Sequence, residues 1–337
     1  MIRILARPAF RSPNGISSSL LLAKAMDERR DVTIKDFNSP LDIIFFRPDI
    51  IILHWPDNLL GLRNLYYILN RSALFLVLAL SRFLFGAKVV WIAHNALGTH
   101  YNKPKQSTVF YKKMLRHLDL IVYPLPSLER ITRSTHSGFC NRVSIPFGPY
   151  PRLEEDPGIT LKLKTEINFD PDTNYIFCYG IIRPYKRLEE LINIFESSIE
   201  LSKYRLIIIG KVQDVEYYRV LQNHAIRSLV IGRYIEDIEF PSIFNIASFC
   251  LFNYNRISNS GSVRMALTYN CPVLVNYFEQ FDDFNSIYRT NMVVQYQSVS
   301  DIPIVLNDTS VQYVKPDWNG STWNCFVDTF LHHAVEP

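Results

Sequence analysis

With 337 residues the chain has room for two domains of ordinary size, each able to bury a core. Its five cysteines form no CxxC pair and have no histidine at metal-ligand spacing, which excludes a zinc site and a disulfide framework and predicts buried thiols in a reducing compartment. Residues 1–150 carry 20 Lys and Arg against 9 Asp and Glu, which leaves 16 of the 36 basic and 23 of the 32 acidic residues to the rest of the chain. This asymmetry predicts an anionic partner for the first part, such as a membrane surface, a lipid phosphate or nucleic acid, although a solvated basic face would have the same composition.

Short β-branched runs alternate with segments of helical character, a pattern typical of βα units and a largely parallel sheet. The first set of expected strands is Ile2–Leu5, Asp49–His54, Lys88–Ala93, Leu120–Tyr123 and Arg142–Pro146. The second set is Tyr175–Tyr179, Arg205–Gly210, Ser228–Ile231, Phe249–Asn253 and Pro272–Asn276. The opening apolar run is too short for a signal peptide. We therefore predict an α/β chain of two doubly wound, Rossmann-like domains that face a cleft, with ligands at the carboxyl ends of the strands.

Between the two sets lies a proline-rich, acidic stretch, Pro149–Gly158, which we expect to resist regular structure and to link the domains. The boundary then falls near residue 150, with residues 1–150 as the N-terminal domain and residues 151–315 as the second.

An apolar segment at residues 72–85 has two interpretations. It is too short and too interrupted to span a bilayer comfortably, so a buried crossover helix is expected. The alternative is an interfacial helix that dips into a membrane, flanked by Arg63, Arg71 and Arg82.

Candidate site residues follow the early strands. Gly15 opens the first helix after a strand and permits close approach of a ligand to that helix start, although no GxGxxG motif is present. His54 and Asp57 end the second strand, where Asp57 could act as a base or merely cap the next helix. His94 ends the third strand and could hydrogen-bond a hydroxyl-rich substrate or be a structural histidine.

The segment from Tyr179 to Ile192 is the most informative part of the chain. An apolar strand ends at Gly180, two cations follow at Arg183 and Lys186, and a helical pattern begins at Leu188. Backbone N–H groups and a helix start attract an anion, and the two side chains neutralise it, so the segment predicts a phosphate site. An ordinary strand–loop–helix unit with surface cations is the alternative.

A second polar loop follows the strand Phe249–Asn253. Four small residues, Asn259, Ser260, Gly261 and Ser262, precede or open a helix and could present N–H groups and hydroxyls to a diphosphate. Lys211 and Tyr254 are weaker candidates for contacts with a nucleotide or sugar. The sequence contains no Asp-x-Asp metal motif and no Ser-His-Asp hydrolase elbow.

These segments together resemble a bacterial glycosyltransferase of the GT-B fold, near the large group-1, family 4-like transferases that build cell-surface polysaccharides. The resemblance runs along most of the chain. It rests on His54-Trp55-Pro56, His94-Asn95, Gly180 through Lys186, Ser242 through Ser248, and Asn259-Ser260-Gly261-Ser262 with Ala266 and Pro272. It implies that residues 1–150 bind the acceptor, that residues 151–315 bind the nucleotide-sugar, and that residues 316–337 form a helix that crosses back to the N-terminal domain.

The resemblance also implies a reaction: transfer of a sugar from a UDP- or GDP-linked donor to a hydroxyl of a lipid-linked saccharide, without a metal or cofactor. Arg183 and Lys186 would stabilise the leaving diphosphate, and Asp57, ahead of His94, would be the base if the enzyme inverts. Two departures stand out. The glutamate pair of retaining members would fall at Ile257 and Met265, so both carboxylates are absent, and the usual arginine would fall at Ile181.

We expect a cytoplasmic protein, peripheral on the inner face of the plasma membrane, where the basic first half meets an anionic surface. Nucleic acid is not expected as a partner, because the basic residues form no aromatic-interleaved patch. A nucleotide-sugar epimerase and a non-catalytic nucleotide-sugar-binding subunit are the alternatives.

Overall fold

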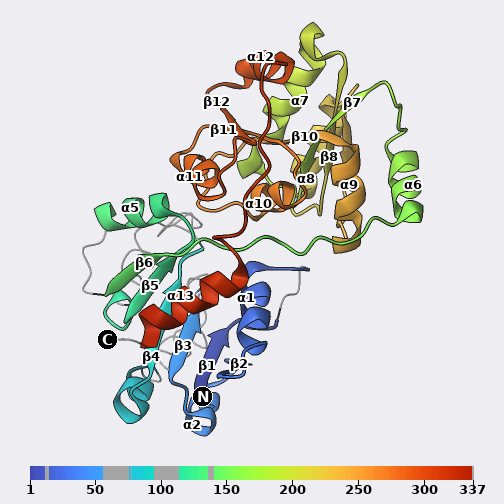
Figure 1. The fold of residues 1–337 in the computed structure, drawn as a ribbon. Helices are drawn as coiled ribbons and strands as arrows, with labels where there is room; N and C mark the ends of the chain where they lie inside the picture. The colour runs from blue at the N-terminus through green and yellow to red at the C-terminus, as the bar shows by residue number, and fades with distance from the viewer. Residues whose placement is uncertain (12–14, 56–75, 77, 95–113, 136–139, 336–337) are drawn as a thin grey trace. The chain divides into compact units, whose positions relative to one another are not determined.

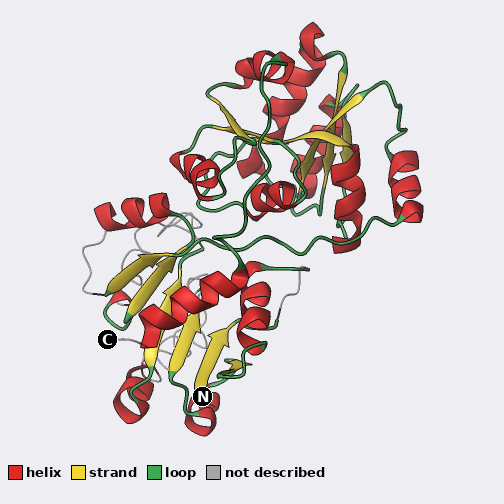
Figure 2. Cartoon of the chain, in the orientation of Figure 1, coloured by secondary structure: helices red, strands yellow, loops and turns green. Residues whose placement is uncertain are grey.

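The computed structural model describes residues 1–11, 15–55, 76, 78–94, 114–135 and 140–335. The chain forms two compact units, the first made of Met1–Gly148 with Trp318–Pro337 and the second of Pro149–Asp317. In each unit helices flank one sheet (Figure 2).

The first unit is built on a six-stranded parallel sheet with the strand order β2-β1-β3-β4-β5-β6. Its strands are β1 (Ile2–Arg7), β2 (Val32–Asp36), β3 (Ile50–Leu53), β4 (Lys88–Ile92), β5 (Leu120–Tyr123) and β6 (Asn141–Ser144). The central strands β3 and β5 are buried along their whole length, as expected for parallel strands covered on both faces. The chain order reverses between β1 and β3, so the carboxyl ends of these strands are where this fold class binds ligands.

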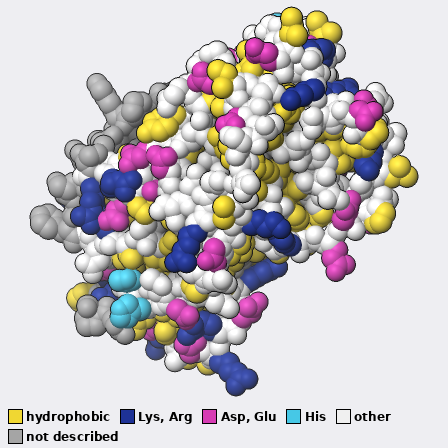
Figure 3. Space-filling model, turned by 45° about the horizontal axis from the view of Figure 1, so that its top comes forward, with side chains coloured by type: hydrophobic (Ala, Val, Ile, Leu, Met, Phe, Trp, Pro, Cys, Tyr) yellow, Lys and Arg dark blue, Asp and Glu magenta, His cyan; other side chains and the backbone are white. Residues whose placement is uncertain are grey.

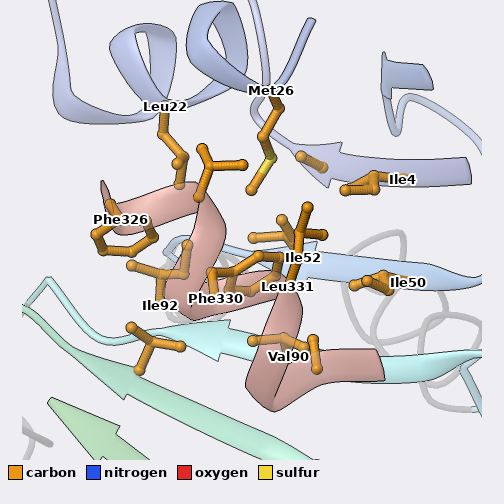
Figure 4. Packing of buried hydrophobic residues seen from close by; sticks show 14 of the residues in the cluster. Ile4, Leu22, Met26, Ile50, Ile52, Val90, Ile92, Phe326, Phe330 and Leu331 are labelled. Atoms are coloured by element: carbon orange, nitrogen blue, oxygen red, sulfur yellow. The ribbon is translucent and has the colours of Figure 1, made fainter. Parts of the chain in front are cut away.

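The helices of the first unit are α1 (Ser18–Asp27), α2 (Pro40–Phe46), α5 (Pro126–Thr135) and α13 (Trp323–Val335). Helix α13 follows all of the second unit in the chain but packs beside α1 on one face of the first sheet (Figure 1). Figure 4 shows Phe326, Phe330 and Leu331 of α13 directed toward the sheet side chains and toward Leu22 and Met26 of α1. The predicted return of a C-terminal helix to the first domain is therefore confirmed.

The second unit has a six-stranded parallel sheet in the order β12-β11-β10-β7-β8-β9. Its strands are β7 (Asn174–Tyr179), β8 (Tyr204–Ile209), β9 (Leu229–Ile231), β10 (Ala247–Phe252), β11 (Val273–Asn276) and β12 (Val293–Tyr296). This is the doubly wound order of the dinucleotide-binding folds, with its reversal between β7 and β10. The prediction of two Rossmann-like domains is confirmed.

The helices of the second unit connect these strands. They are α6 (Pro157–Glu166), α7 (Leu188–Ser197), α8 (Val215–His224), α9 (Phe240–Ile246), α10 (Gly261–Thr268), α11 (Glu279–Ile287) and α12 (Ile302–Asn307). Short 3₁₀ turns occur at Pro184–Lys186, Ile199–Leu201, Asp237–Glu239 and Val299–Asp301.

The predicted linker is more ordered than its composition indicated. Pro157 and Gly158 begin α6, because Asp156 caps that helix by accepting from the N–H groups of Gly158 and Ile159, and proline is well suited to the first helical position. The N–H of Tyr150 donates to Thr268 Oγ1 at the end of α10. The expectation that this stretch resists regular structure was therefore wrong for its last two residues.

The cysteines are free thiols, and Cys178, Cys250 and Cys271 are buried as predicted, whereas Cys140 and Cys325 are half-buried. Several predicted residues lie outside the described ones: Asp57, Arg63, Arg71, and residues 72–75 and 77 of the apolar segment at 72–85.

The packing of α13 generates a stability prediction. Phe330 is fully buried against the first sheet, so Phe330→Ala should lower the free energy of unfolding by about 3–5 kcal/mol through lost burial and a cavity. Chemical denaturation measures this change. The matched control is Phe83→Ala, since Phe83 is 83% exposed, and equal midpoints for the two variants would contradict the packing described here.

Candidate active site

The best-defined polar site of the second unit lies where its strand order reverses. Strand β7 ends at Tyr179 and continues into Gly180, and the neighbouring strand β10 ends at Phe252 and continues into Asn253. Because the connections leave these two strands in opposite directions, the loops after them part and leave their carboxyl ends accessible to a ligand. Both segments that the sequence analysis selected as diphosphate-binding start here.

Position 180 requires a glycine, both for its backbone conformation and for the space that neighbouring side chains occupy. Its φ is +96°, a conformation that residues with a Cβ rarely adopt. A Cβ at this position would lie 3.2 Å from Lys186 Nζ and 3.7 Å from Ser262 Oγ. Gly210, at the end of β8, is also needed, because its own Cβ would lie 1.8 Å from the Gly180 carbonyl oxygen. The bare α-carbon of Gly180 therefore adjoins both the Lys186 amine and the Ser262 hydroxyl.

Lys186 is the buried cation of this site. Only 5% of its surface is exposed, and its Nζ donates to the Tyr179 carbonyl oxygen at 3.0 Å. Burial lowers the pKa of its amine, and the nearby Arg183 guanidinium lowers that pKa further. Among the described residues Lys186 forms no ion pair with a carboxylate. An ammonium group has three N–H donors, so this side chain can still bind an anion.

The start of α10 faces the same glycine. Ser260 caps the helix by accepting from Val263 N at 3.2 Å, and its hydroxyl also lies 3.0 Å from the Tyr254 hydroxyl. The side chain of Ser260 is thus engaged in holding the loop. Gly261 and Ser262 are the first two helical residues, whose N–H groups have no acceptor within a helix, and the positive end of the helix dipole lies there. Such N–H groups at the positive end of a helix are the kind of donors that attract anions, and here they lie close to Lys186.

The loop between β10 and α10 is held by the side-chain amide of Asn276, by a backbone hydrogen bond and by a stacked tyrosine pair. The buried Asn276 accepts from Tyr254 N and donates to Tyr254 O, both at 2.7 Å. The N–H of Asn255 donates to the Tyr185 carbonyl oxygen at 2.7 Å, and the rings of Tyr185 and Tyr254 are stacked. The two predicted donor segments are therefore joined directly. Tyr254 is buried and serves this scaffold, and burial raises the pKa of its hydroxyl.

Arg187 was not selected from the sequence but belongs to the same region. Its φ of 44° is in the left-handed region, where glycine is the usual residue, and it immediately precedes α7. Its guanidinium donates to Asn253 Oδ1 at 3.0 Å, and Asn253 Nδ2 donates to Glu190 Oε2 at 2.9 Å. Arg187 thus connects the start of α7 with the start of the second donor loop.

The remaining predicted donor residues are placed less centrally. Arg183 is half-buried and donates to Gln213, Asn259 is half-buried in the loop before α10, and Lys211 is exposed after β8. Gly15 belongs to the first unit, where it precedes α1 with a φ of +79°. The structure thus brings Lys186, Gly261 and Ser262 together around Gly180.

In the first unit two histidines end neighbouring strands. His54 follows β3 and His94 follows β4, and His54 Nδ1 lies 2.9 Å from His94 Nε2, so one ring donates to the other. Both are buried, and Trp55 stacks on His94 with a centroid separation of 4.4 Å. Burial lowers the pKa of His54 to about 3, which keeps that ring neutral. Nε2 of His94 is engaged with His54 and is therefore not available to a substrate hydroxyl.

His94 and Asp57 were predicted as site residues, but the contact between the two imidazoles was not. The sequence does hold a signal for this contact: His54 and His94 each follow a strand, and the two strands, β3 and β4, are neighbours in the sheet, with Leu53 opposite Trp91. Within the part of the chain that the structure describes, no group of three or more His, Cys, Asp or Glu side chains could hold a metal ion.

Comparisons with known proteins agree with this architecture. No family model matches the chain. Two curated sequences from Xanthomonas campestris pv. campestris, each named GDP-mannose:glycolipid 4-beta-D-mannosyltransferase, are 23% identical to it over 280 residues, which cover 82% of this chain and 75% of the relative.

Solved structures show the same fold at low sequence identity. Sucrose-phosphate synthase from Thermosynechococcus elongatus has a TM-score of 0.69 at 12% identity and covers 100% of this chain and 97% of that one. An alpha,alpha-trehalose-phosphate synthase (UDP-forming) from Burkholderia xenovorans has a TM-score of 0.67 at 9% identity, with 99% of both chains covered. Anabaena HepE in complex with UDP and glucose has a TM-score of 0.65 at 12% identity, with 98% and 95% covered.

The two doubly wound units define the chain as a protein of the GT-B fold. Together with sequence relatives that are transferases by name, that fold supports glycosyltransferase activity, as the sequence resemblance implied. Its assignment to the group-1, family 4-like branch stays a prediction.

The buried imidazole of His54 generates a pH prediction. Its pKa is 6.5 in the unfolded chain and about 3 in the folded one, so between these values the unfolded chain binds an extra proton and stability is lost as the pH falls. This group alone should cost about 2 kcal/mol between pH 7 and pH 5.

The measurement is the free energy of unfolding of the parent and of His54→Gln at both pH values. The variant should lose less stability on acidification. His224→Gln, a change at an exposed histidine of α8, is the control and should behave as the parent. Identical pH dependence of all three proteins would contradict a neutral buried His54.

Proposed function

We propose that this glycosyltransferase takes its sugar from a nucleotide-diphosphate donor and transfers it to a hydroxyl of a lipid-linked saccharide, in the assembly of a surface polysaccharide. The donor assignment rests on one observation: Gly180 adjoins both the buried Lys186 amine and Ser262 at the start of α10. Among nucleotides we propose GDP before UDP, because the sequence relatives carry GDP-mannose and glycolipid in their name.

In this proposal the second unit binds the diphosphate. Lys186 supplies a positive charge that burial has removed from water, and the N–H groups of Gly261 and Ser262 supply fixed donors. Arg183 adds charge from the half-exposed side. Gly15, Asn259, Ser260, Lys211 and Tyr254 stay predicted donor contacts, with Ser260 and Tyr254 acting mainly through the loop that they hold.

The chemical step follows from these charges. The acceptor oxygen bonds to the anomeric carbon of the sugar as the bond from that carbon to the phosphate oxygen breaks, and the diphosphate leaves with the bonding electrons. Lys186 and Arg183 stabilise the negative charge that develops on the leaving group. In an inverting reaction the hydroxyl proton goes to a base, for which we propose Asp57 ahead of His94.

We further propose that the reaction needs no metal ion, since the cation and the helix start described above offset the diphosphate charge. Activity that persists in excess EDTA would support this.

We propose a peripheral location on the inner face of the plasma membrane. Two observations support this. Residues 1–150 contain 20 basic residues against 9 acidic ones, and the name of the sequence relatives includes a glycolipid. Among the described residues, no helix has the length and apolar character needed to cross a bilayer. The epimerase and non-catalytic alternatives are not favoured, because the sequence relatives are transferases by name.

The proposed donor site generates a prediction about nucleotide binding. Lys186→Met keeps a side chain of similar length but removes the charge, so it should lower kcat/KM by about 10²-fold and abolish the thermal shift that GDP produces in the parent. The folded protein should be no less stable, because the variant no longer buries a cation. Differential scanning fluorimetry with GDP and with UDP, and a transfer assay, measure these effects.

Lys203→Met is the matched control for this variant, since Lys203 is exposed just before β8. It should keep the nucleotide shift and the rate of the parent. A Lys186→Met protein as active as the parent would remove the diphosphate assignment, and a larger shift with UDP than with GDP would reverse the choice of nucleotide.

The proposed base generates a further prediction. Asp57→Asn cannot accept a proton, so its rate should fall by about 10²-fold or more, and the acid limb of the pH–rate profile should disappear. His94→Gln should retain that limb. A rate for Asp57→Asn near that of the parent would exclude Asp57 and favour His94.

A further inference from the structure

Two helical segments of the first unit present apolar side chains to solvent. These are α2 and the helix of residues 78–85, together with the helical residue Leu76. Phe45 and Phe83 are 82% and 83% exposed. The other exposed apolar members are Leu41, Ile44, Leu76, Leu80 and Leu84, with exposed fractions between 43% and 60%. We call these seven residues the apolar surface.

The two segments lie beside each other. Helix α2 ends just before β3 and the 78–85 helix ends just before β4, and these two strands pair in parallel, with Ile50 opposite Lys88. The guanidinium of Arg47, which follows α2, lies 6.0 Å from the ring centre of Phe85. The apolar side chains therefore belong to one region of the unit.

Both helices also have a buried side. Ile43 of α2 is 2% exposed, and Leu78 and Ser81 of the second helix are fully buried. A helix that packs on a sheet normally turns polar residues to water on its other side. Here the outer side carries phenylalanine, leucine and isoleucine as well, and amphipathic surfaces with such side chains insert at the boundary between lipid headgroups and acyl chains.

The charges near the apolar surface favour an anionic partner. Lys35, Arg47 and Lys88 are exposed, and none of them pairs with a carboxylate among the described residues.

The neighbouring carboxylates are engaged within the unit. Asp42 accepts from the N–H groups of Asn38 and Ser39, Asp49 pairs with Arg3, and Asp119 pairs with Arg82. The unpaired charge around the apolar surface is positive, which fits anionic lipid headgroups.

We infer that the first unit docks on an anionic lipid bilayer through α2 and the 78–85 helix, with Phe45 and Phe83 inserted and Lys35, Arg47 and Lys88 at the headgroups. The inference deepens the proposed membrane location and rests on it. By contrast, the face of the molecule seen in Figure 3 has basic and acidic side chains interspersed, which does not favour charge-driven attachment through that face.

The test is flotation of the full chain with vesicles of phosphatidylcholine and phosphatidylglycerol in equal parts, and with phosphatidylcholine alone. The parent should float with the anionic vesicles, and the bound fraction should fall as salt rises. The double variant Phe45→Ser, Phe83→Ser should lower the partition coefficient by about tenfold or more. A triple variant should lose most of the preference for phosphatidylglycerol; its changes are Lys35→Ala, Arg47→Ala and Lys88→Ala.

The control is Ile199→Ser with Ile226→Ser, two equally exposed apolar residues of the second unit, which should float as the parent does. Flotation of the Phe45, Phe83 variant equal to that of the parent would overturn the assigned surface and leave membrane association standing. A parent protein that does not float with either kind of vesicle would contradict both the assigned surface and the proposed membrane location. A concentration-dependent dimer that this variant abolishes would mean that a second copy covers the apolar surface, against our inference. In every case the GDP-induced thermal shift of the variant tests the transferase proposal separately.

Discussion

The ammonium group of Lys186 is held out of water, and the arrangement of the second unit's site depends on that constraint. A buried charge is costly unless other groups replace its solvation, and one carbonyl oxygen at 3.0 Å replaces only part of it. An anionic ligand would supply the rest. Gly180 keeps the space beside the amine open, and the start of α10 contributes donors on the other side. In the proposed donor site, the desolvation that makes the Lys186 charge costly would also strengthen its attraction for a diphosphate.

In the first unit, by contrast, burial keeps a titratable side chain uncharged. His54 and His94 are both buried, and burial lowers the pKa of His54 until that ring is neutral. The neutral His54 ring, paired with His94 beside the indole of Trp55, suits an uncharged, hydroxyl-bearing ligand better than a phosphate. The two units thus differ in the charge that they can accept, which agrees with separate donor and acceptor roles.

Much of this architecture could be predicted from the sequence. The ten expected strands all occur, and most of them are parallel strands buried on both faces, which read as continuous apolar runs. The strands that were missed, β2 and β12, are edge strands, and polar residues such as Lys35 and Gln295 interrupt their short apolar patterns. Within the site, Gly180 and Lys186 followed from strand, glycine and cation spacing. The His54–His94 contact and the role of Arg187 did not, because both depend on which loops the sheet brings together at the carboxyl ends of neighbouring strands.

The placement of α13 has a consequence for how the chain folds during synthesis. The second unit is contiguous in sequence, whereas the core of the first unit includes Phe326 and Phe330, which emerge from the ribosome after all of residues 149–317. The usual order, in which the N-terminal domain completes first, is therefore reversed. Until α13 arrives, the nascent first unit exposes the face of its sheet that α13 later covers, so it is the part of the chain that a chaperone would need to protect for longest.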